Sequence, residues 1–363
     1  MAREDLIRSS SLGEHSEFHP SYMSRFRVRR VGSGLDAPRF MAFLPSSNPR
    51  TEGCGTLLVA ERGSGNILRG TLIPGAAEQQ IRFLPLKQGL NAPTSLSVHQ
   101  GWVYVGESDR VSKFQLSDPS RSEVLVQGLP QSGHSTKTVL VHGDRLYVSI
   151  GSSCNSCVET DPKRAAVLEY GLDGSGGSVY SSGLRNSVGL AVNPWTGDIW
   201  ATTNGRDHLG DDSPPDTVDV LRRGAFYGWP HCHGGEVPDP DLGEEDACES
   251  LPAPAVRLPA HSAPLGLAFH DPLSPMAAPG FPRGLYVALH GSWNRSKPSG
   301  HSIVTIPLDT RGRVVPGGTH QSVVQWPETV RPAGLVFAGG HNCGESGGLY
   351  VSDDRNGTIY LLR

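Results

Sequence analysis

The stretch GLRNSVGLAVNPWTGDIWATTNGRDHLGDD, residues 183–212, contains two apolar segments with a turn between them and a polar loop after them. The alternation in NSVGLAVN predicts a half-buried strand. The following NPWTGD supplies the Asn, Pro and Gly that tight turns use. Polar residues therefore lie just before one strand and just after the next, and the same pattern recurs along the chain.

The first strand of this pair has six copies, which is the strongest indication of the fold class. They are APRFMAFL (37–44), APTSLSVH (92–99), STKTVLVH (135–142), NSVGLAVN (186–193), APLGLAFH (263–270) and RPAGLVFA (331–338). A second strand follows each copy, and often a third. Six strand meanders without a convincing helix predict an all-β, six-bladed β-propeller. A set of β-sandwiches is the alternative, but it gives no reason for six copies of one strand pair.

A propeller must close its ring, and this defines the expected domain. The strand-like FRVRRVGSGL (26–35) has no blade before it, so we expect it to complete the last blade. Residues 25–363 are then one propeller domain, and residues 1–24 are expected to be a flexible leader.

The composition excludes several classes of protein. Hydrophobic residues make up 37% of the chain and charged residues 19%, as in soluble globular proteins. A net charge of −4 gives no reason to expect nucleic-acid binding. No apolar run approaches the roughly 20 residues of a membrane span. Six cysteines favour disulfides over a zinc or redox role for Cys154 and Cys157. Disulfides indicate a secreted or periplasmic protein, whereas no signal peptide is visible.

The polar residues flanking the strands are expected to meet on one face. In a propeller the first strand of each blade begins where the second strand ends, so both sets ring one axial pocket. Before the first strands come Arg39, Thr94, His134, Arg185, Asn186 and Arg331. After the second strands come Glu61, Arg62, Glu107, the loop 204–212, HGSWNR (290–295) and DDRN (353–356).

Together, these side chains favour a shared ligand-binding site over an independent structural role for each residue. Arginine pairs bidentately with carboxylates and phosphates, carboxylates and exposed carbonyls suit Ca²⁺, and a histidine can act as a general base. Each residue alone has an ordinary alternative, namely a surface histidine, a capping arginine or a solvated turn. Their expected co-location favours the functional interpretation.

Longer motifs resemble a known family, the glucose/sorbosone dehydrogenases, which are soluble quinoproteins that use pyrroloquinoline quinone (PQQ). The resemblance covers about residues 36–363. It rests on LVAERGSGNI (58–67), GHSTKTVLVHGDRLYVSIGSSCNSC (133–157), SGLRNSVGLAVNPWTGDIWATTNGRDHLGDD (182–212), FYGWPHCHG (226–234), ALHGSWNRS (288–296), RPAGLVFAGG (331–340) and GGLYVSDDRNGTIYLL (347–362). It implies a six-bladed propeller, in agreement with the repeats.

The resemblance also implies roles for single residues. His134 matches the base that takes a substrate hydroxyl proton while hydride passes to the quinone. Cofactor contacts are expected from Arg185, Asn186, Arg331, Arg295, Thr94 and Arg62. The carbonyls of Gly205 and Arg206 match those that hold the quinone-bound Ca²⁺, and Asp211, Asp212 and Tyr227 resemble a second, structural calcium region. The cysteine pattern implies the disulfides Cys154–Cys157 and Cys232–Cys248, with Cys54–Cys343 as a third candidate, because these two lie in neighbouring blades of a closed ring.

Several positions depart from the family pattern. Arg295 lies where glucose-oxidising members carry a cofactor-binding lysine, and neither Lys87 nor Lys137 is an obvious substitute. Arg206 lies where proline is common, and many sorbosone-type members carry a histidine near Thr94. The substrate is therefore a sugar of undefined identity, with a cytochrome or quinone as the expected electron acceptor.

Two other functions compete with this one. A Ca²⁺-dependent propeller lactonase would use axial acids and amides such as Glu61, Glu107, Asn186 and Asn204, but without an arginine cluster. A non-catalytic propeller that binds a sugar or a protein is the second alternative.

Overall fold

The computed structural model describes residues 26–46, 54–73, 80–339 and 343–363. Within them the regular structure is β-strand, apart from one short 3₁₀ helix, η1 (Gly344–Ser346). The strands of these residues form six four-stranded antiparallel sheets and one two-stranded hairpin. The predicted six-bladed β-propeller is confirmed, whereas the leader expected at 1–24 lies outside the described residues. None of the described segments is a helix of the length and hydropathy needed to cross a membrane.

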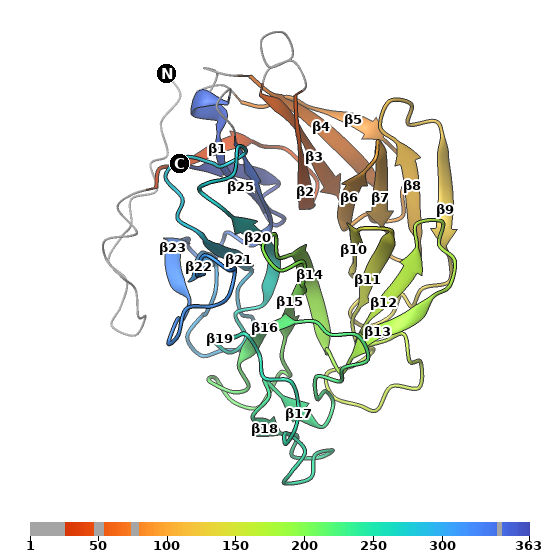
Figure 1. Ribbon diagram of the computed structural model, residues 1–363, viewed down its shortest axis with the longest axis vertical. Helices are drawn as coiled ribbons and strands as arrows, with labels where there is room; N and C mark the ends of the chain where they lie inside the picture. The colour runs from red at the N-terminus through yellow and green to blue at the C-terminus, as the bar shows by residue number, and fades with distance from the viewer. Residues whose placement is uncertain (1–25, 47–53, 74–79, 340–342) are drawn as a thin grey trace. The chain divides into compact units, whose positions relative to one another are not determined.

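The chain divides into two compact units, which are described separately. The first unit comprises residues 1–88, 267–290 and 301–363, and the second comprises residues 89–266 and 291–300. The boundary falls inside β20 (Pro264–His270). Each unit thus contains most or all of three blades (Figure 1).

In the first unit, the blade formed last along the chain is completed by the strand that comes first. The order β1-β26-β25-β24 places Val28 opposite Leu362, which confirms the pairing expected for residues 26–35. The Cys54–Cys343 disulfide joins this blade to the one that begins with β2. The strands of the unit, besides β20, are β1 (Val28–Gly32), β2 (Pro38–Pro45), β3 (Gly55–Glu61), β4 (Asn66–Leu72), β5 (Phe83–Lys87), β21 (Gly284–Leu289), β22 (Ser302–Pro307), β23 (Gln321–Gln325), β24 (Pro332–Ala338), β25 (Gly348–Asp353) and β26 (Thr358–Leu362).

In the second unit, two blades are simple meanders and one carries a long insertion. β16 pairs with β19 although residues 221–255 intervene, and this insertion holds the β17–β18 hairpin and the Cys232–Cys248 disulfide. The strands are β6 (Ser95–His99), β7 (Trp102–Gly106), β8 (Val111–Gln115), β9 (Ser122–Val126), β10 (Lys137–His142), β11 (Arg145–Ile150), β12 (Ala166–Gly171), β13 (Ser178–Ser182), β14 (Asn186–Val192), β15 (Ile199–Asn204), β16 (Asp216–Val220), β17 (Cys232–His233), β18 (Val237–Pro238) and β19 (Val256–Leu258).

The turn between β14 and β15 shows how local sequence sets the geometry of a blade. The Asn193 side-chain oxygen accepts hydrogen bonds from the backbone N–H groups of Trp195 (3.0 Å) and Thr196 (3.3 Å), and Gly197 adopts a φ of +78°. An asparagine side chain and a positive-φ glycine are the usual components of such turns. The two strands then pair so that Asn186 lies opposite Asn204. The polar flanks of both strands consequently lie at the same end of this blade.

Hydroxyl side chains connect the inner strands of neighbouring blades within each unit. In the second unit, the Thr138 hydroxyl donates to the Val188 carbonyl oxygen. In the first unit, the Ser352 hydroxyl donates to the Arg39 carbonyl oxygen at 2.6 Å. The blades also pack through aliphatic and aromatic cores, such as the buried cluster that includes Leu146 and Val148. Burial of this kind fixes the strands, and the strand ends in turn fix the polar residues.

Candidate active site

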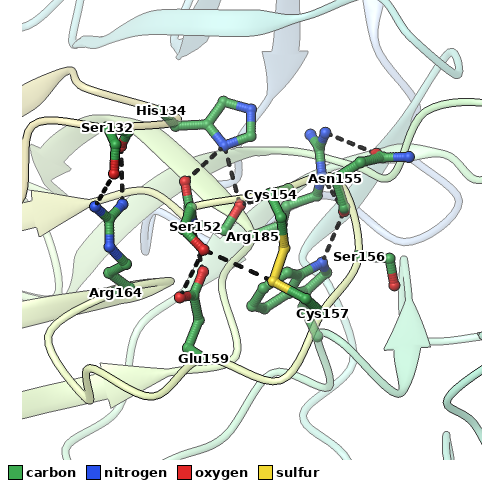
Figure 2. The surroundings of a disulfide bond; sticks show 12 residues. Ser132, His134, Ser152, Cys154, Asn155, Ser156, Cys157, Glu159, Arg164 and Arg185 are labelled. Atoms are coloured by element: carbon green, nitrogen blue, oxygen red, sulfur yellow. Dashed lines mark hydrogen bonds between the residues drawn. A yellow bond between two sulfur atoms is a disulfide. The ribbon is translucent and has the colours of Figure 1, made fainter.

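His134 is anchored through one ring nitrogen and open at the other (Figure 2). Its Nδ1 lies 3.1 Å from the Ser152 carbonyl oxygen and 3.0 Å from the Ser152 hydroxyl oxygen. Because a carbonyl oxygen can only accept a hydrogen bond, Nδ1 carries the proton. Nε2 makes no hydrogen bond to any residue within 26–46, 54–73, 80–339 or 343–363. Its lone pair is therefore directed away from the anchor and is open to a proton from a ligand.

The surroundings of His134 keep its ring neutral. Burial, and after it the positive charge of Arg185, lowers the pKa of His134 to about 4. The hydrogen bond to Ser152 and the charge of Asp207 act in the opposite direction and are weaker. A histidine with this pKa is unprotonated at neutral pH, which is the state that a general base needs.

Arg185 is buried directly before β14 and is held by several acceptors. It is 5% exposed. Its Nη2 pairs with the Asp207 carboxylate at 2.8 Å, and its Nε donates to the Asn155 carbonyl oxygen at 2.9 Å. The positive charge is thus balanced by Asp207, and the direction of the guanidinium group is fixed by the backbone of a neighbouring loop.

The absence of a side chain at Gly151 allows His134 and Asn186 to lie close together. A Cβ atom built on Gly151 would collide with the Cβ atom of His134 and would lie 2.7 Å from Oδ1 of Asn186. Any larger residue would push the base and the amide apart. Two of the residues expected to work together from sequence are therefore close neighbours in the second unit.

The peptide groups of Gly205 and Arg206 have the properties of a cation site. The Gly205 N–H donates to the buried Asp216 carboxylate at 2.7 Å. The carbonyl oxygens of Gly205 and Arg206 accept no hydrogen bond from the described part of the chain. Carbonyl oxygens without a hydrogen-bond donor are suitable Ca²⁺ ligands. The Arg206 guanidinium group pairs instead with Asp239 and Asp241.

Asp211 and Asp212 attach their loop to residues 291–300 of the same unit. The Asp211 carboxylate accepts from the Ser296 N–H at 3.2 Å, and the Asp212 carboxylate pairs with Arg295 Nη2 at 2.9 Å. The Tyr227 hydroxyl donates to the Val220 carbonyl oxygen at 2.6 Å. Among the described residues no hydrogen bond joins Tyr227 to either carboxylate. The second calcium region and the cofactor role of Arg295 stay predictions.

The first unit holds a separate polar group around Asp354. Its Oδ2 pairs with Arg39 Nη1 at 2.5 Å, and its Oδ1 accepts from His290 Nε2 at 2.9 Å. His290 Nδ1 in turn lies 2.8 Å from Arg331 Nη2. Burial lowers the pKa of His290, so its neutral ring can donate to Asp354 and accept from Arg331.

Asp354 carries the negative charge at the centre of this group. Burial would raise the pKa of Asp354, but its contacts with His290 and Arg39 hold it far below the usual range. Asp354 is therefore ionised beside two arginines and a neutral histidine. The cofactor role of Arg331 stays a prediction.

Thr94 and Arg62, two further predicted cofactor contacts, both donate hydrogen bonds to backbone carbonyl oxygens. The Thr94 hydroxyl is buried and donates to the Lys137 carbonyl oxygen at 2.8 Å, so it connects neighbouring blades. Arg62 is exposed, and its backbone N–H donates to the Ala37 carbonyl oxygen at 3.1 Å. Their cofactor roles stay predictions.

Sequence reasoning did not single out Asn155 or Asp216. Asn155 was hidden inside the cysteine loop, and the signal for it was a hydrogen-bonding side chain fixed between two cysteines. Asp216 lies at the start of the buried strand β16, where burial raises its pKa to about 6. Its signal was a pair of carboxylates, Asp216 and Asp219, in the short strand DTVDV. All three disulfides implied by the resemblance are present, so the sulfurs of Cys154 and Cys157 are not free to bind zinc.

A family model described as TrAA12-like matches residues 20–363. The chain belongs to this family. A PQQ-dependent pyranose dehydrogenase from Coprinopsis cinerea is 27% identical over 249 residues, which cover 52% of this chain and 31% of that protein. The chain spans about a third of the length of the first curated relatives that it matches. These findings confirm the resemblance to the PQQ sugar dehydrogenases.

Two solved structures share the fold. A calcium structure of the Trichoderma reesei family AA12 protein superposes with a TM-score of 0.76 at 21% identity, covering 96% of this chain and 99% of the other. The holo form of the PQQ domain of Coprinopsis cinerea pyranose dehydrogenase gives 0.75 at 23% identity, covering 96% and 98%. At these identities the likeness is evidence for the propeller alone.

Proposed function

We propose that this protein is a PQQ- and Ca²⁺-dependent sugar dehydrogenase that passes electrons to an acceptor other than oxygen. The observation that carries the proposal is the geometry of His134. Ser152 fixes the protonated Nδ1, Nε2 is open, and burial and Arg185 hold the pKa at about 4. A general base must be within reach of a substrate proton and must be unprotonated at the working pH.

The described residues fit the cofactor. The Gly205 and Arg206 carbonyls accept no hydrogen bond from the described residues and would hold the Ca²⁺ ion. Arg185 and Asn186 would contact the quinone, and Arg331 would pair with a cofactor carboxylate. PQQ, when bound, would supply a two-electron hydride acceptor for the sugar, and Ca²⁺ would supply Lewis acidity. His134 Nε2 takes the proton of the sugar hydroxyl, and Ser152 keeps the ring in the tautomer that can do so.

The lactonase alternative is less well supported. Glu61 accepts hydrogen bonds from the Asp36 N–H at 2.8 Å and from the Ser64 hydroxyl. Glu107 accepts from the Asn91 N–H at 2.6 Å and from the Ser112 hydroxyl at 2.5 Å. Both acids are buried and hold their own loops in place. Their carboxylate oxygens already accept these hydrogen bonds, so they are poor candidates for an axial metal site.

The compartment and the substrate class belong to the same proposal. Three disulfides are typical of an oxidising compartment, so we propose a secreted or periplasmic protein. The substrate class is an aldose, pyranose or sorbosone-like sugar, and the acceptor is a cytochrome or a quinone.

Reconstitution tests the function directly. Apo-protein is mixed with PQQ and Ca²⁺, the visible spectrum of the quinone is followed, and reduction of a dye is measured with a panel of sugars. We expect a spectral shift on binding and sugar-dependent dye reduction. His134→Gln should give the shift without the reduction. A wild-type protein that binds no PQQ would overturn the proposal.

A further inference from the structure

The loop between Cys154 and Cys157 contacts two residues of the proposed site, His134 through Ser152 and Arg185 directly. The disulfide closes a loop with a sequence separation of only 3 residues. Figure 2 shows Asn155 beside Arg185 and the Cys154 backbone beside Ser152. The Ser152 hydroxyl donates to the Cys154 carbonyl oxygen at 2.6 Å, and the same hydroxyl lies 3.0 Å from His134 Nδ1. The loop thus touches both the base and the arginine.

Asn155 makes an unusually complete set of hydrogen bonds. Its side-chain Oδ1 accepts from Arg185 Nη2 at 2.9 Å and from the Asp207 N–H at 2.8 Å. Its side-chain Nδ2 donates to the Asp207 carbonyl oxygen at 3.0 Å. Its own carbonyl oxygen accepts from Arg185 Nε at 2.9 Å and from Trp229 Nε1 at 3.3 Å.

These contacts join Arg185 to the loop that carries the proposed calcium ligands, and the two must be aligned to hold one cofactor. Arg185 belongs to the proposed quinone contacts, and Asp207 directly follows the Gly205 and Arg206 carbonyls. An amide is suited to this position because one end accepts and the other donates. A carboxylate could still accept from Arg185 and from the Asp207 N–H, but it could not donate to the Asp207 carbonyl oxygen.

We infer that Asn155 is a positioning residue that aligns Arg185 with the calcium loop, and that the Cys154–Cys157 disulfide holds Asn155 in place. The inference rests on the proposed function for the identity of the ligands. It does not rest on it for the effect on His134, which can be measured in the protein without cofactor. A covalent link of such short span restricts a loop of few residues, so its effect is local.

Two substitutions separate alignment from general damage. Asn155→Ala removes both side-chain functions, and Asn155→Asp removes only the donor. Asn91→Ala is the matched control, because Asn91 is an exposed asparagine of the same unit that bonds to Asp109. PQQ is titrated at saturating Ca²⁺, and Ca²⁺ at saturating PQQ, by visible spectroscopy. We expect Asn155→Ala to weaken both by about 10- to 100-fold.

The second variant gives a different pattern. Asn155→Asp should weaken Ca²⁺ by about 10-fold while PQQ stays within about threefold of wild type, because the acceptor for Arg185 remains. Asn91→Ala should change neither. Equal losses for both ligands in Asn155→Asp, or no loss in Asn155→Ala, would overturn the inference.

A readout in the protein without cofactor makes the test independent of PQQ. The imidazole of His134 is titrated by NMR in wild type and in Asn155→Ala. The charged groups acting on it are Arg185, Asp207 and Arg164. Asn155→Ala keeps the backbone carbonyl that accepts from Arg185 Nε but removes the side-chain acceptor of Nη2. The guanidinium group is then less firmly placed, its charge acts less strongly on His134, and the pKa of His134 should rise by about half a unit or more. An unchanged pKa counts against Asn155. A wild type that binds no PQQ, combined with the expected rise, would remove the proposed function and retain the positioning role.

The disulfide is tested by replacing both cysteines. Cys154→Ser with Cys157→Ser should weaken PQQ and Ca²⁺ in the same direction as Asn155→Ala. Cys54→Ser with Cys343→Ser, in the other unit, should leave both affinities unchanged. If the two pairs have the same effect on binding, the Cys154–Cys157 bond has no special role in placing Asn155.

Discussion

The pKa of His134 gives the most direct test of the proposed chemistry. A histidine of ordinary pKa is half protonated near pH 6.5, whereas one with a pKa of about 4 is protonated in well under about 1% of molecules at that pH. The free base should therefore persist far into the acid range. We expect kcat/KM to stay flat from neutral pH down to about 5 and to fall only near pH 4.

The same shift predicts a dependence of stability on pH. The folded pKa lies below the unfolded one, so the unfolded state binds the proton first as the pH falls. The contribution is fully present above about pH 6.5 and is lost as the pH approaches 4. A shift of this size corresponds to about 3 kcal/mol, which is an upper value because the ring is partly exposed.

The assay compares wild type with His134→Gln. Urea unfolding is measured near pH 7 and near pH 4.5 at constant ionic strength, and kcat/KM is followed over the same range. Other groups titrate equally in both proteins, so the difference between them isolates His134. The variant should lose less stability on acidification, and its kcat should drop about 10²- to 10⁴-fold at unchanged PQQ affinity. An NMR titration that places the pKa of His134 between about 6 and 7 would refute the reasoning, because it would mean that burial does not lower this pKa.

Three further perturbations test other parts of the molecule. Arg331→Met should weaken PQQ binding by about 2–5 kcal/mol in a spectroscopic titration, and excess quinone should restore its turnover but not that of His134→Gln; an unchanged affinity would exclude contact between Arg331 and the cofactor. Gly151→Ala should reduce kcat more than it reduces the free energy of unfolding, since the new methyl group separates His134 from Asn186; a fully active variant would show that their spacing is unimportant. Removal of Cys54–Cys343, with a sequence separation of 289, should cost about 6 kcal/mol in urea unfolding, against about 2 kcal/mol for Cys154–Cys157 with a separation of 3; the reverse order would contradict the loop-entropy argument.

The architecture could be predicted because it depends on local patterns. Six copies of one strand pair specify six blades, and alternation together with turn residues such as Asn193 and Gly197 sets each hairpin. The pairing of residues 26–35 with the last blade followed from the unpaired strand alone. The disulfides, by contrast, came from the family resemblance, since six cysteines allow many pairings.

The detailed contacts of the site could not be predicted, because they join residues far apart in the chain. Asn155 reaches Asp207 across 52 positions, and no local pattern marks that pair. Arg206 was expected to offer its carbonyl, and the structure adds ion pairs of its side chain with two aspartates of the insertion. Thr94 was expected to contact the cofactor, which stays a prediction, and the structure adds a hydrogen bond from its hydroxyl to the Lys137 carbonyl oxygen. Such side-chain contacts depend on three-dimensional geometry, which the sequence does not contain.

The charges of the second unit explain why the proposed function needs a cation there. The charge of Arg185 is balanced by Asp207 at 2.8 Å, and the Arg206 side chain is paired with aspartates. What remains at the loop is two carbonyl oxygens, which present the negative ends of their dipoles. An anionic quinone would meet no net positive charge from these groups. A Ca²⁺ ion on the Gly205 and Arg206 carbonyls would make the charge that this loop presents to the quinone positive. Chelation of calcium should therefore remove PQQ binding itself and not only the chemical step.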